Sequence, residues 1–391
     1  MFKKAVALAT VLICASLVFS AQAVSAKAYA LVDQSSGRLI EGANTDERLP
    51  MASTTKIMTG LIACESGRLD ETVTISAEEI RIEGSSMGLQ DGEKLTLREL
   101  TYGLLLESGN DAANVIAVTL DGSVTAFAQK MNARARKLGL TGTHFANSSG
   151  LDAPEHYTTA LDLARLGAAA MNNPEFAKIV GTRKIKIPYA GTANARTLFN
   201  HNRLLSTFDG MLGIKTGFTE KDGRCLVTCA RRGGVTLVAA TLKDPDDWDD
   251  HTKLLESGFA RLKPQRLISD KLTLSAKVAG GAAETVNLEC DPDVTAALAE
   301  GELEKVNMTV ELPEFVYAPV KKGQKLGRLV FTVDGQTVAA TPLTAADSVK
   351  QRLPEEIKGG IGAGAALILA AAATAAFVIY RKLKEKNESG T

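Results

Sequence analysis

The chain has 391 residues, which is enough for two domains and accessory segments. Its composition is that of a globular protein, with 45% hydrophobic and 23% charged residues, and 45 basic residues balance 45 acidic ones. Because there is no basic excess and no stripe of lysine and arginine interleaved with aromatic residues, the sequence predicts no nucleic-acid partner.

The first 26 residues have the pattern of a secretory signal peptide. Lys3 and Lys4 precede an apolar run over residues 5–19, and small residues follow it. Two small-x-small triplets, at 21–23 and 24–26, both fit the rule for signal-peptidase cleavage. We predict a signal peptide over 1–26 that is cleaved after Ala26. The alternative is an uncleaved N-terminal anchor.

The C-terminal end carries a second apolar segment. Residues 360–380 contain no charge, and at about 1.5 Å of rise per residue such a helix spans a hydrocarbon core of roughly 30 Å. Basic residues follow at once and would stay cytoplasmic: Arg381, Lys382, Lys384 and Lys386. We predict a transmembrane helix over 360–380, a cytoplasmic tail over 381–391, and a single-pass cell-membrane protein that is otherwise extracytoplasmic, periplasmic or wall-facing. A buried or interfacial helix is the alternative.

Strands bracket a helical middle between residues 27 and 262. Residues 28–33 alternate like a strand, and a Ser-Ser-Gly turn leads to a second strand at Arg38-Leu39. Helical periodicity begins at Ser53 and returns over 97–106, 112–120, 127–138 and 162–171. Strands at 225–230 and 235–242 are joined by an Arg-Arg-Gly-Gly hairpin signal. We predict one α/β domain over 27–262, with its terminal strands in one sheet and helices flanking it.

Residues 263–348 differ in character, because helical periodicity ends and short alternating runs appear. One such run consists of Val306, Met308, Val310 and Leu312. Another, 329–333, leads into Asp334-Gly335, which favours a hairpin turn. We predict a small all-β domain over 263–348 and a polar linker over 349–359.

Four cysteines remain after signal removal and allow up to two disulfides: Cys64, Cys225, Cys229 and Cys290. Cys225 and Cys229 lie at even spacing in an apolar run, so we expect buried free thiols on one face, although a disulfide stays possible for all four. The histidines form no short ligand pair near these cysteines, and no metal site is predicted. We interpret one acidic stretch as a solvated loop: Asp244, Asp246, Asp247, Asp249 and Asp250.

Three short motifs stand out because each occurs once in the chain. They are Ser53-Thr54-Thr55-Lys56 (S-x-x-K), Ser108-Gly109-Asn110 (S-x-N) and Lys215-Thr216-Gly217 (K-T-G). Taken singly, Ser53 would be an ordinary helix N-cap, Lys56 a solvated helix residue and the K-T-G a surface turn. All three together, in this order, make a much more specific signal.

The spacing of these motifs has a chemical meaning. If Ser53 opens a helix, Lys56 lies one turn later on the same face. A serine hydroxyl is a weak nucleophile until a base takes its proton, and lysine is such a base only when burial and positive charge lower its pKa. Lys215 can supply that charge and attract an anionic substrate. Asn110 can orient Lys56 or the substrate, and Ser108 can relay a proton to a leaving amine.

S-x-x-K with K-T-G is the signature of penicillin-binding proteins and class A β-lactamases. The chain resembles most the low-molecular-mass penicillin-binding proteins, the D-alanyl-D-alanine carboxypeptidases of peptidase family S11, from about Ala28 to the C-terminal tail. The stretches that carry the resemblance are 49–59, 86–89, 107–112, 143–147, 150–151 and 213–219.

This resemblance implies a transpeptidase/β-lactamase-like catalytic domain, a β-rich domain that raises it off the membrane, and a C-terminal anchor. It implies a serine-type peptidase that removes the terminal D-alanine from peptidoglycan stem pentapeptides through an acyl-enzyme on Ser53. β-Lactams would act as acylating inhibitors, and no cofactor is implied.

The resemblance also assigns roles to residues. The implied catalytic residues are Ser53, Lys56, Ser108 and Asn110. The implied substrate-binding residues are Lys215, Thr216, Gly217 and Phe218. In this assignment Lys56 is the general base, Lys215 binds the terminal carboxylate of the substrate, and the backbone N–H groups of Ser53 and Phe218 form the oxyanion hole.

The chain departs from the family pattern in one respect that concerns substrate binding. The arginine often found shortly before the Lys-Leu-Leu helix is missing, so Lys215 grips the carboxylate alone or with help from Arg203. Three alternatives stay open. A β-lactamase is disfavoured because no E-x-x-L-N segment lies between Asn110 and Lys215. The others are a DD-endopeptidase and a catalytically silent wall-binding module.

Overall fold

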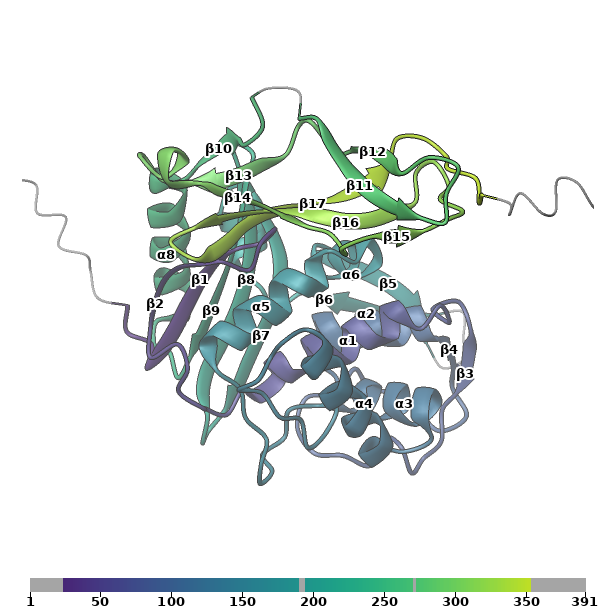
Figure 1. Ribbon diagram of the computed structural model, residues 1–391. Coiled ribbons are helices and arrows are strands. Elements are labelled where there is room, and N and C mark those ends of the chain that lie inside the picture. Colours follow the sequence, from purple (N-terminus) through teal and green to yellow (C-terminus); the bar gives the residue numbers. More distant parts are fainter. Residues whose placement is uncertain (1–23, 190–193, 270–271, 353–391) are drawn as a thin grey trace, which may run out of the picture. The chain divides into compact units, whose positions relative to one another are not determined.

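The computed structural model describes residues 24–189, 194–269 and 272–352 (Figure 1). These residues form two compact units. The first holds the residues up to 267 together with 295–306 and 332–339. The second holds 268–294, 307–331 and the residues from 340 onward.

The first unit is built on a five-stranded antiparallel sheet in the order β2-β1-β9-β8-β7. The strands are β1 (Ala28–Asp33), β2 (Leu39–Ala43), β7 (Met211–Thr219), β8 (Gly223–Arg232) and β9 (Val235–Leu242). Because β1 pairs with β9 along its whole length, the two ends of this region share one sheet. This confirms the predicted arrangement, with the helical middle inserted between the terminal strands.

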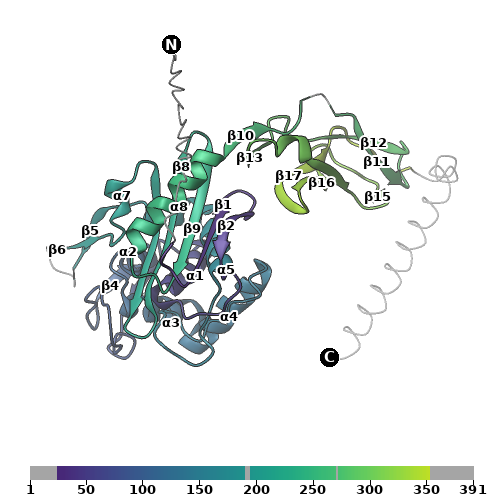
Figure 2. The same cartoon turned by 90° about the vertical axis from the view of Figure 1, so that its left-hand side faces the viewer.

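Helices cover both faces of this sheet (Figure 2). Alternate residues of β1 face opposite ways, so Ala30 and Val32 join the large core on the side of α5 (Ala160–Met171). Leu31 points to the other face and packs in a second cluster with Leu254 of α8 (Asp247–Arg261). The sheet is therefore buried on both faces.

The helical middle contains further elements of the first unit. Its helices are η1 (Ala52–Thr55), α1 (Lys56–Glu65), α2 (Leu97–Leu106), α3 (Asn110–Asp121), α4 (Val124–Lys137), α6 (Pro174–Val180) and α7 (Leu204–Thr207). Two small hairpins pair β3 (Thr72–Thr74) with β4 (Lys94–Thr96) and β5 (Lys184–Pro188) with β6 (Ala195–Phe199). Thr96 and Glu99 form a capping box that starts α2, which fixes the helix that leads to the S-x-N motif.

The prediction of a solvated loop for the acidic stretch is wrong for three of its five residues, whereas Asp246 and Asp249 are exposed. Residues from Asp247 onward form α8, and Asp244, Asp247 and Asp250 are each less than 5% exposed. Two physical causes account for the difference. Acidic side chains are favoured in the first turn of a helix by its dipole, and Leu254 and Leu255 supply the apolar face that packs on the sheet.

Strands dominate the chain after α8, as predicted. A six-stranded sheet has the order β14-β16-β17-β12-β11-β15. Its strands are β11 (Leu274–Ala279), β12 (Thr285–Glu289), β14 (Asn307–Glu311), β15 (Val316–Tyr317), β16 (Lys325–Val333) and β17 (Gln336–Ala345). A separate pair joins β10 (Lys263–Arg266) to β13 (Thr295–Leu298), and a short 3-10 turn, η2, spans Leu303–Lys305. The predicted Asp334-Gly335 turn joins β16 to β17 with φ values of 48° and 78°, as a left-handed hairpin turn requires.

The four cysteines among the described residues are free thiols. Cys64, Cys225 and Cys229 are buried and Cys290 is partly exposed. Burial raises the pKa of Cys225 and of Cys229 to about 12, so both stay protonated at neutral pH. This confirms the expectation of buried free thiols on β8.

Several predictions concern residues outside the described part of the chain. They are the signal peptide up to residue 23, the linker from 353, the transmembrane helix over 360–380 and the tail over 381–391. Among the helices of residues 24–352 that are described, none combines the length and apolarity needed to cross a bilayer.

A buried histidine makes the stability of the first unit pH-dependent. His251 of α8 is fully buried, with ring nitrogens 2.7 Å from Thr228 Oγ1 and 3.0 Å from Thr241 Oγ1. Burial lowers its pKa from 6.5 to about 3. Because the folded state holds the neutral ring, the stabilisation is complete above pH 6.5 and is lost as the pH falls towards 3.

We expect this residue to contribute a loss of about 1.4 kcal/mol of unfolding free energy per pH unit between those limits. Urea unfolding at several pH values, compared between the wild type and His251→Gln, measures the contribution. The variant should be less stable at neutral pH but have a shallower acid dependence. Equal slopes in the two proteins would contradict the prediction.

Candidate active site

The S-x-x-K motif forms the junction between η1 and α1. Ser53 lies in the 3-10 turn and Lys56 is the first residue of α1, so one helical turn separates them. Ala52, just before the serine, has a left-handed φ of 46°. This backbone conformation is uncommon for a residue with a Cβ, and such outliers cluster at functional sites.

The amine of Lys56 is fully buried and has three oxygen partners. Its Nζ lies 2.9 Å from Ser53 Oγ, 2.8 Å from Asn110 Oδ1 and 2.5 Å from the carbonyl oxygen of Ser149. Asn110 is itself fixed, since its Nδ2 donates to the Glu83 carbonyl oxygen at 2.7 Å. The amine is therefore held against the serine hydroxyl from three separate segments.

This environment disfavours the charged form of Lys56. Burial lowers its pKa well below the usual 10.5, and the positive charge of Lys215 lowers it further, while Asp111 opposes them. Burial also lowers the pKa of Lys215, to about 7. A neutral Lys56 amine beside Ser53 Oγ can accept the hydroxyl proton.

The S-x-N motif forms the turn between α2 and α3. Ser108 adopts a left-handed φ of 62°, and Asn110 begins α3. The neighbouring Asp111 carboxylate accepts from Ser86 Oγ at 2.5 Å and from the backbone N–H groups of Met87, Gly88 and Leu89 at 3.1 to 3.2 Å. The carboxylate thus fastens a second loop beside the turn that carries Ser108 and Asn110.

The K-T-G motif lies on β7, at the edge of the five-stranded sheet. Lys215 is 1% exposed, and its Nζ donates to Ser108 Oγ at 3.0 Å and to the Thr216 carbonyl oxygen at 2.9 Å. A Cβ atom on Gly217 would lie 3.1 Å from the backbone nitrogens of Ser53 and Thr54. A side chain at this position would therefore push β7 away from the serine.

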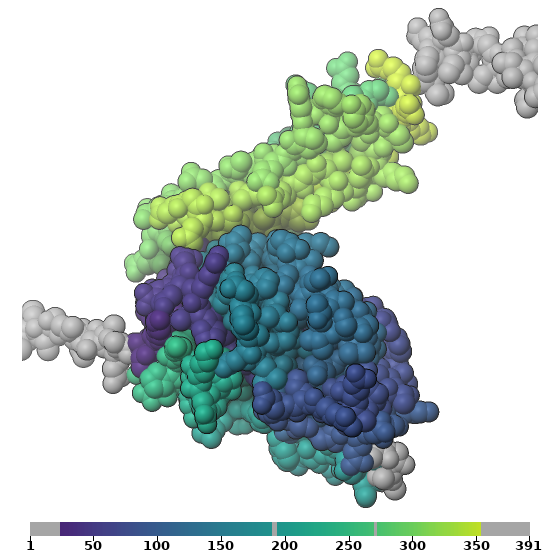
Figure 3. All heavy atoms as spheres, turned by 90° about the horizontal axis from the view of Figure 1, so that it is seen from below, coloured from purple at the N-terminus to yellow at the C-terminus, as the bar shows by residue number. Residues whose placement is uncertain are grey.

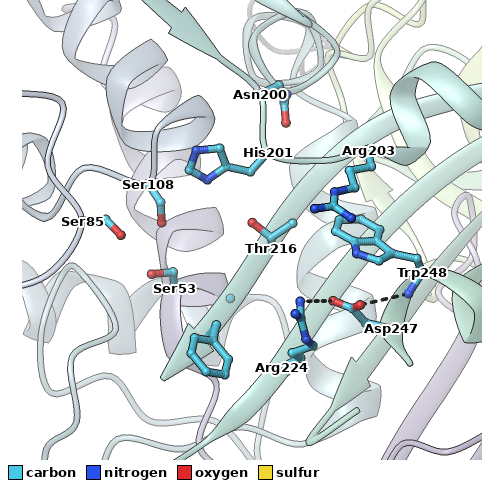
Figure 4. Close-up of a pocket in the computed structure, with 12 residues that line it drawn as sticks. Ser53, Ser85, Ser108, Asn200, His201, Arg203, Thr216, Arg224, Asp247 and Trp248 are labelled. Atoms are coloured by element: carbon cyan, nitrogen blue, oxygen red, sulfur yellow. Dashed lines mark hydrogen bonds and ion pairs between the residues drawn. The ribbon is translucent and has the colours of Figure 1, made fainter. Parts of the chain in front are cut away.

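An open cleft of about 490 Å³ runs past these groups (Figure 4). Ser53 and Ser108 line one side of it, and Thr216 of β7 separates them from a second group of side chains. That second group consists of Arg203, Arg224, Asp247 and Trp248. The Arg224 guanidinium lies 3.8 Å from the Asp247 carboxylate, and half of the Arg224 side chain is exposed. The cleft thus offers two arginine side chains across Thr216 from its serine hydroxyls.

The structure brings all of the predicted site residues together. Lys56 contacts Ser53 and Asn110, and Lys215 contacts Ser108. Thr216, Gly217 and Phe218 line the cleft beside Ser53. Ser108 pairs with Lys215, and Phe218 is 62% exposed. Across residues 24–352 as described, no group of three acidic, histidine or cysteine side chains could hold a metal ion.

Sequence reasoning missed several residues that shape the site. The carbonyl of Ser149 is a ligand of the Lys56 amine, and Asn147 Oδ1 accepts from the N–H groups of Ser149 and Gly150 to form that turn. A backbone carbonyl leaves no residue-type signal. Arg224 and Trp248 were missed because they reach the cleft from β8 and α8, elements that carry no motif.

Two family profiles match the chain. The profile of the Peptidase_S11 family, described as D-alanyl-D-alanine carboxypeptidase, covers residues 16–246. The profile of the penicillin-binding protein 5 C-terminal domain covers residues 264–351. The first match covers most of the predicted catalytic domain, and the second covers nearly all of the predicted β domain.

Similar proteins have been named in several bacteria. D-alanyl-D-alanine carboxypeptidase DacF of Bacillus subtilis is 31% identical over 336 residues, which cover 83% of this chain and 86% of the relative. DacC of Escherichia coli is 33% identical over 350 residues, with coverage of 85% and 86%. The crystal structure of penicillin-binding protein 5 from Haemophilus influenzae has a TM-score of 0.66 at 27% identity, and the match covers 84% of this chain and 98% of that one.

Proposed function

Because the chain belongs to the S11 family of D-alanyl-D-alanine carboxypeptidases, we propose that it uses Ser53 to remove the terminal D-alanine from peptidoglycan stem pentapeptides. It is a serine-type carboxypeptidase of the penicillin-binding type. The observation that carries the residue assignment is the buried Lys56 amine 2.9 Å from Ser53 Oγ.

Acylation begins with proton transfer in this proposal. Neutral Lys56 takes the proton of Ser53, and Ser53 Oγ attacks the carbonyl carbon of the penultimate D-alanine. The resulting oxyanion is stabilised by the backbone N–H groups of Ser53 and Phe218. Phe218 lies on the edge strand β7, which has no strand neighbour on its outer side among the described residues.

The peptide bond then breaks and the leaving amine of D-alanine takes up a proton. Ser108 relays this proton: its own hydroxyl proton goes to the amine, and the proton that Lys56 took from Ser53 replaces it, which returns Lys56 to its neutral form. The Ser108 hydroxyl lies 3.0 Å from the Lys215 amine. Water next attacks the acyl-enzyme ester, with Lys56 accepting the proton of the water. Lys56 passes this proton to Ser53 Oγ as the ester bond breaks, which regenerates both residues. The shortened peptide leaves as a carboxylic acid that loses its proton to water.

Lys215 binds the substrate carboxylate together with arginine residues of the cleft. Lys215 with a pKa of about 7 is only partly charged in the free protein at neutral pH, and a bound carboxylate would favour its charged form. Arg203 and Arg224 remain cationic and line the same cleft. In this proposal Arg224 binds the substrate carboxylate in place of the arginine that the sequence lacks before the Lys-Leu-Leu helix.

β-Lactams are expected to acylate Ser53 by the same route, since the protein is of the penicillin-binding type.

The proposal also includes export of the catalytic domain and its anchoring in the cell membrane. A signal peptide at the N-terminus and an apolar helix over 360–380 would place the catalytic cleft outside the cell membrane. Support for both comes from the sequence pattern alone.

One experiment tests the proposed function directly. The purified protein is incubated with a pentapeptide ending in D-Ala-D-Ala and, separately, with fluorescent penicillin. We expect release of D-alanine, one covalent label per chain, and a label that maps to Ser53 by peptide mass spectrometry. Absence of D-alanine release would favour the silent wall-binding alternative, and rapid loss of the label would favour a β-lactamase.

Arg224→Gln should weaken substrate binding more than chemistry. Loss of a charge-assisted contact to the carboxylate is expected to raise the KM for the pentapeptide about tenfold, with little change in kcat. Steady-state kinetics measure both constants. Arg231→Gln is the matched control, because Arg231 lies on the same strand and contacts Thr236 away from the cleft. An unchanged KM in Arg224→Gln would remove this residue from substrate recognition.

A further inference from the structure

The residues just before β1 are held by two buried carboxylates. Ser25 N–H donates to Asp250 Oδ2 at 2.5 Å, and Ser25 Oγ lies 2.7 Å from the same oxygen and 3.0 Å from Asp244 Oδ1. Asp244 and Asp250 are each 1% exposed, whereas Ser25 lies at the surface above them. Val24 packs against the hydrophobic cluster between the sheet and α8. Residues 24 and 25 thus belong to the folded unit.

This carboxylate pair has little positive charge around it. Lys253 Nζ lies 3.6 Å from Asp250 Oδ1 but pairs more closely, at 2.5 Å, with Asp249. Asp244 Oδ1 accepts from the Asp246 N–H at 3.1 Å, while its Oδ2 is buried with no hydrogen-bond partner among the described residues. Burial, with the neighbouring Asp250 charge, raises the pKa of Asp244 to about 6. A positive group beside Ser25 would therefore be strongly favoured.

We propose that signal peptidase cleaves this chain between Ala23 and Val24, and that the α-ammonium group of Val24 then becomes the counter-ion of Asp244 and Asp250. Water adds across the peptide bond, leaving a carboxylate on Ala23 and an ammonium group on Val24. The inference rests on the export signal proposed above and is independent of the roles given to the cleft residues.

Both candidate cleavage sites satisfy the small-x-small rule, so the sequence alone cannot separate them. The structure separates them because cleavage after Ala26 removes Ser25. That cut would take away all three contacts to Asp244 and Asp250 and leave two buried carboxylates without them. A buried carboxylate that loses its hydrogen-bond partners destabilises the folded state. Cleavage after Ala23 keeps the contacts and adds a cation.

The new ammonium group would lie within reach of the pair. Consecutive Cα atoms are about 3.8 Å apart, and the Val24 nitrogen precedes the Ser25 N–H that already contacts Asp250. An α-ammonium group offers three donors where a peptide nitrogen offers one. Its ordinary pKa of about 7.7–8.0 keeps it charged at neutral pH.

The ion pair would stabilise one wall of the active-site cleft. Asp244 follows β9, and Asp250 lies in the first turn of α8, which also carries the cleft residues Asp247 and Trp248. Figure 3 shows the purple atoms of the first strands beside the green atoms of the segment that follows β9. Removal of the leader thus fixes the start of the helix that bounds the substrate site.

N-terminal sequencing of the processed protein tests the cleavage site. The full chain is expressed with its own leader in a bacterial host that exports it, and we expect a sequence that begins at Val24. Ala26→Leu should be processed at the same bond, whereas Ala23→Leu combined with Ala26→Leu, which removes both sites, should accumulate as precursor. A wild-type chain that begins at Lys27 would overturn the inference. If that chain still releases D-alanine, the proposed function is unaffected.

Thermal unfolding tests the counter-ion. A chain that begins at Val24 is compared with one that carries an extra glycine before Val24, which moves the ammonium group away, and with Ser25→Ala. We expect each change to lower Tm by about 5 °C. Ser275→Ala, at an exposed serine of β11, should leave Tm unchanged. Equal Tm values for the chains with and without the extra glycine would exclude the ion pair.

Discussion

Replacing Ser53 by alanine should abolish both D-alanine release and covalent labelling by penicillin. Removal of a catalytic serine typically costs about 10⁶-fold in kcat, because no other group can form the acyl-enzyme. Ser108, the serine of the S-x-N motif, pairs with Lys215, whereas Ser53 is the serine that contacts the Lys56 amine. The measurement is D-alanine release from a pentapeptide, with gel fluorescence of the labelled protein beside it.

Ser76→Ala is the matched control for this variant, since Ser76 is exposed and lies outside the cleft. It should release D-alanine and bind fluorescent penicillin like the wild type. Covalent labelling of Ser53→Ala at a normal level would place the nucleophile elsewhere and end the assignment of this cleft as the active site.

Replacing Lys56 by alanine should slow acylation by about 10²–10⁴-fold, the usual contribution of a general base. Penicillin can still enter the cleft, because Lys215 and the arginine residues are retained. The expected result is therefore slow labelling of Ser53. Stopped-flow or timed gel assays of the acylation rate, at several penicillin concentrations, separate the rate from the binding step.

The wild-type acylation rate should also rise with pH as one group loses its proton at a pKa well below 10.5. The direction follows from burial of Lys56 and from the nearby charge of Lys215, both of which favour the neutral amine that acts as base. In Lys56→Ala the acylation rate should no longer rise with pH in this range. Lys130→Ala, at an exposed lysine that pairs with Asp121, is the control. Near-normal acylation by Lys56→Ala would exclude its role as base.

Much of this site could be predicted from the sequence, because few proteins combine the S-x-x-K, S-x-N and K-T-G motifs in this order. The helical spacing of Ser53 and Lys56 required only that a helix begin at the motif, and the structure has a 3-10 turn followed by α1 there. The paired end strands β1 and β9 could be predicted from alternation. In both cases a local pattern determined the structure.

The rest depended on contacts between distant segments. The carbonyl of Ser149 holds the Lys56 amine, yet any residue type could supply that oxygen. The acidic stretch looked solvated because charged residues usually are, whereas tertiary packing buries Asp244, Asp247 and Asp250 beneath or beside α8. Arg224 reaches the cleft only because β8 lies next to β7. Such information is not carried by a motif.

The burial of two lysine amines in one core also bears on the evolution of this protein. Lys56 and Lys215 are among its largest fully buried side chains, and each would be easier to bury as an apolar residue. Selection for folding stability alone would therefore replace them. Their presence represents a trade-off in which the domain gives up part of its stability to keep a reactive amine.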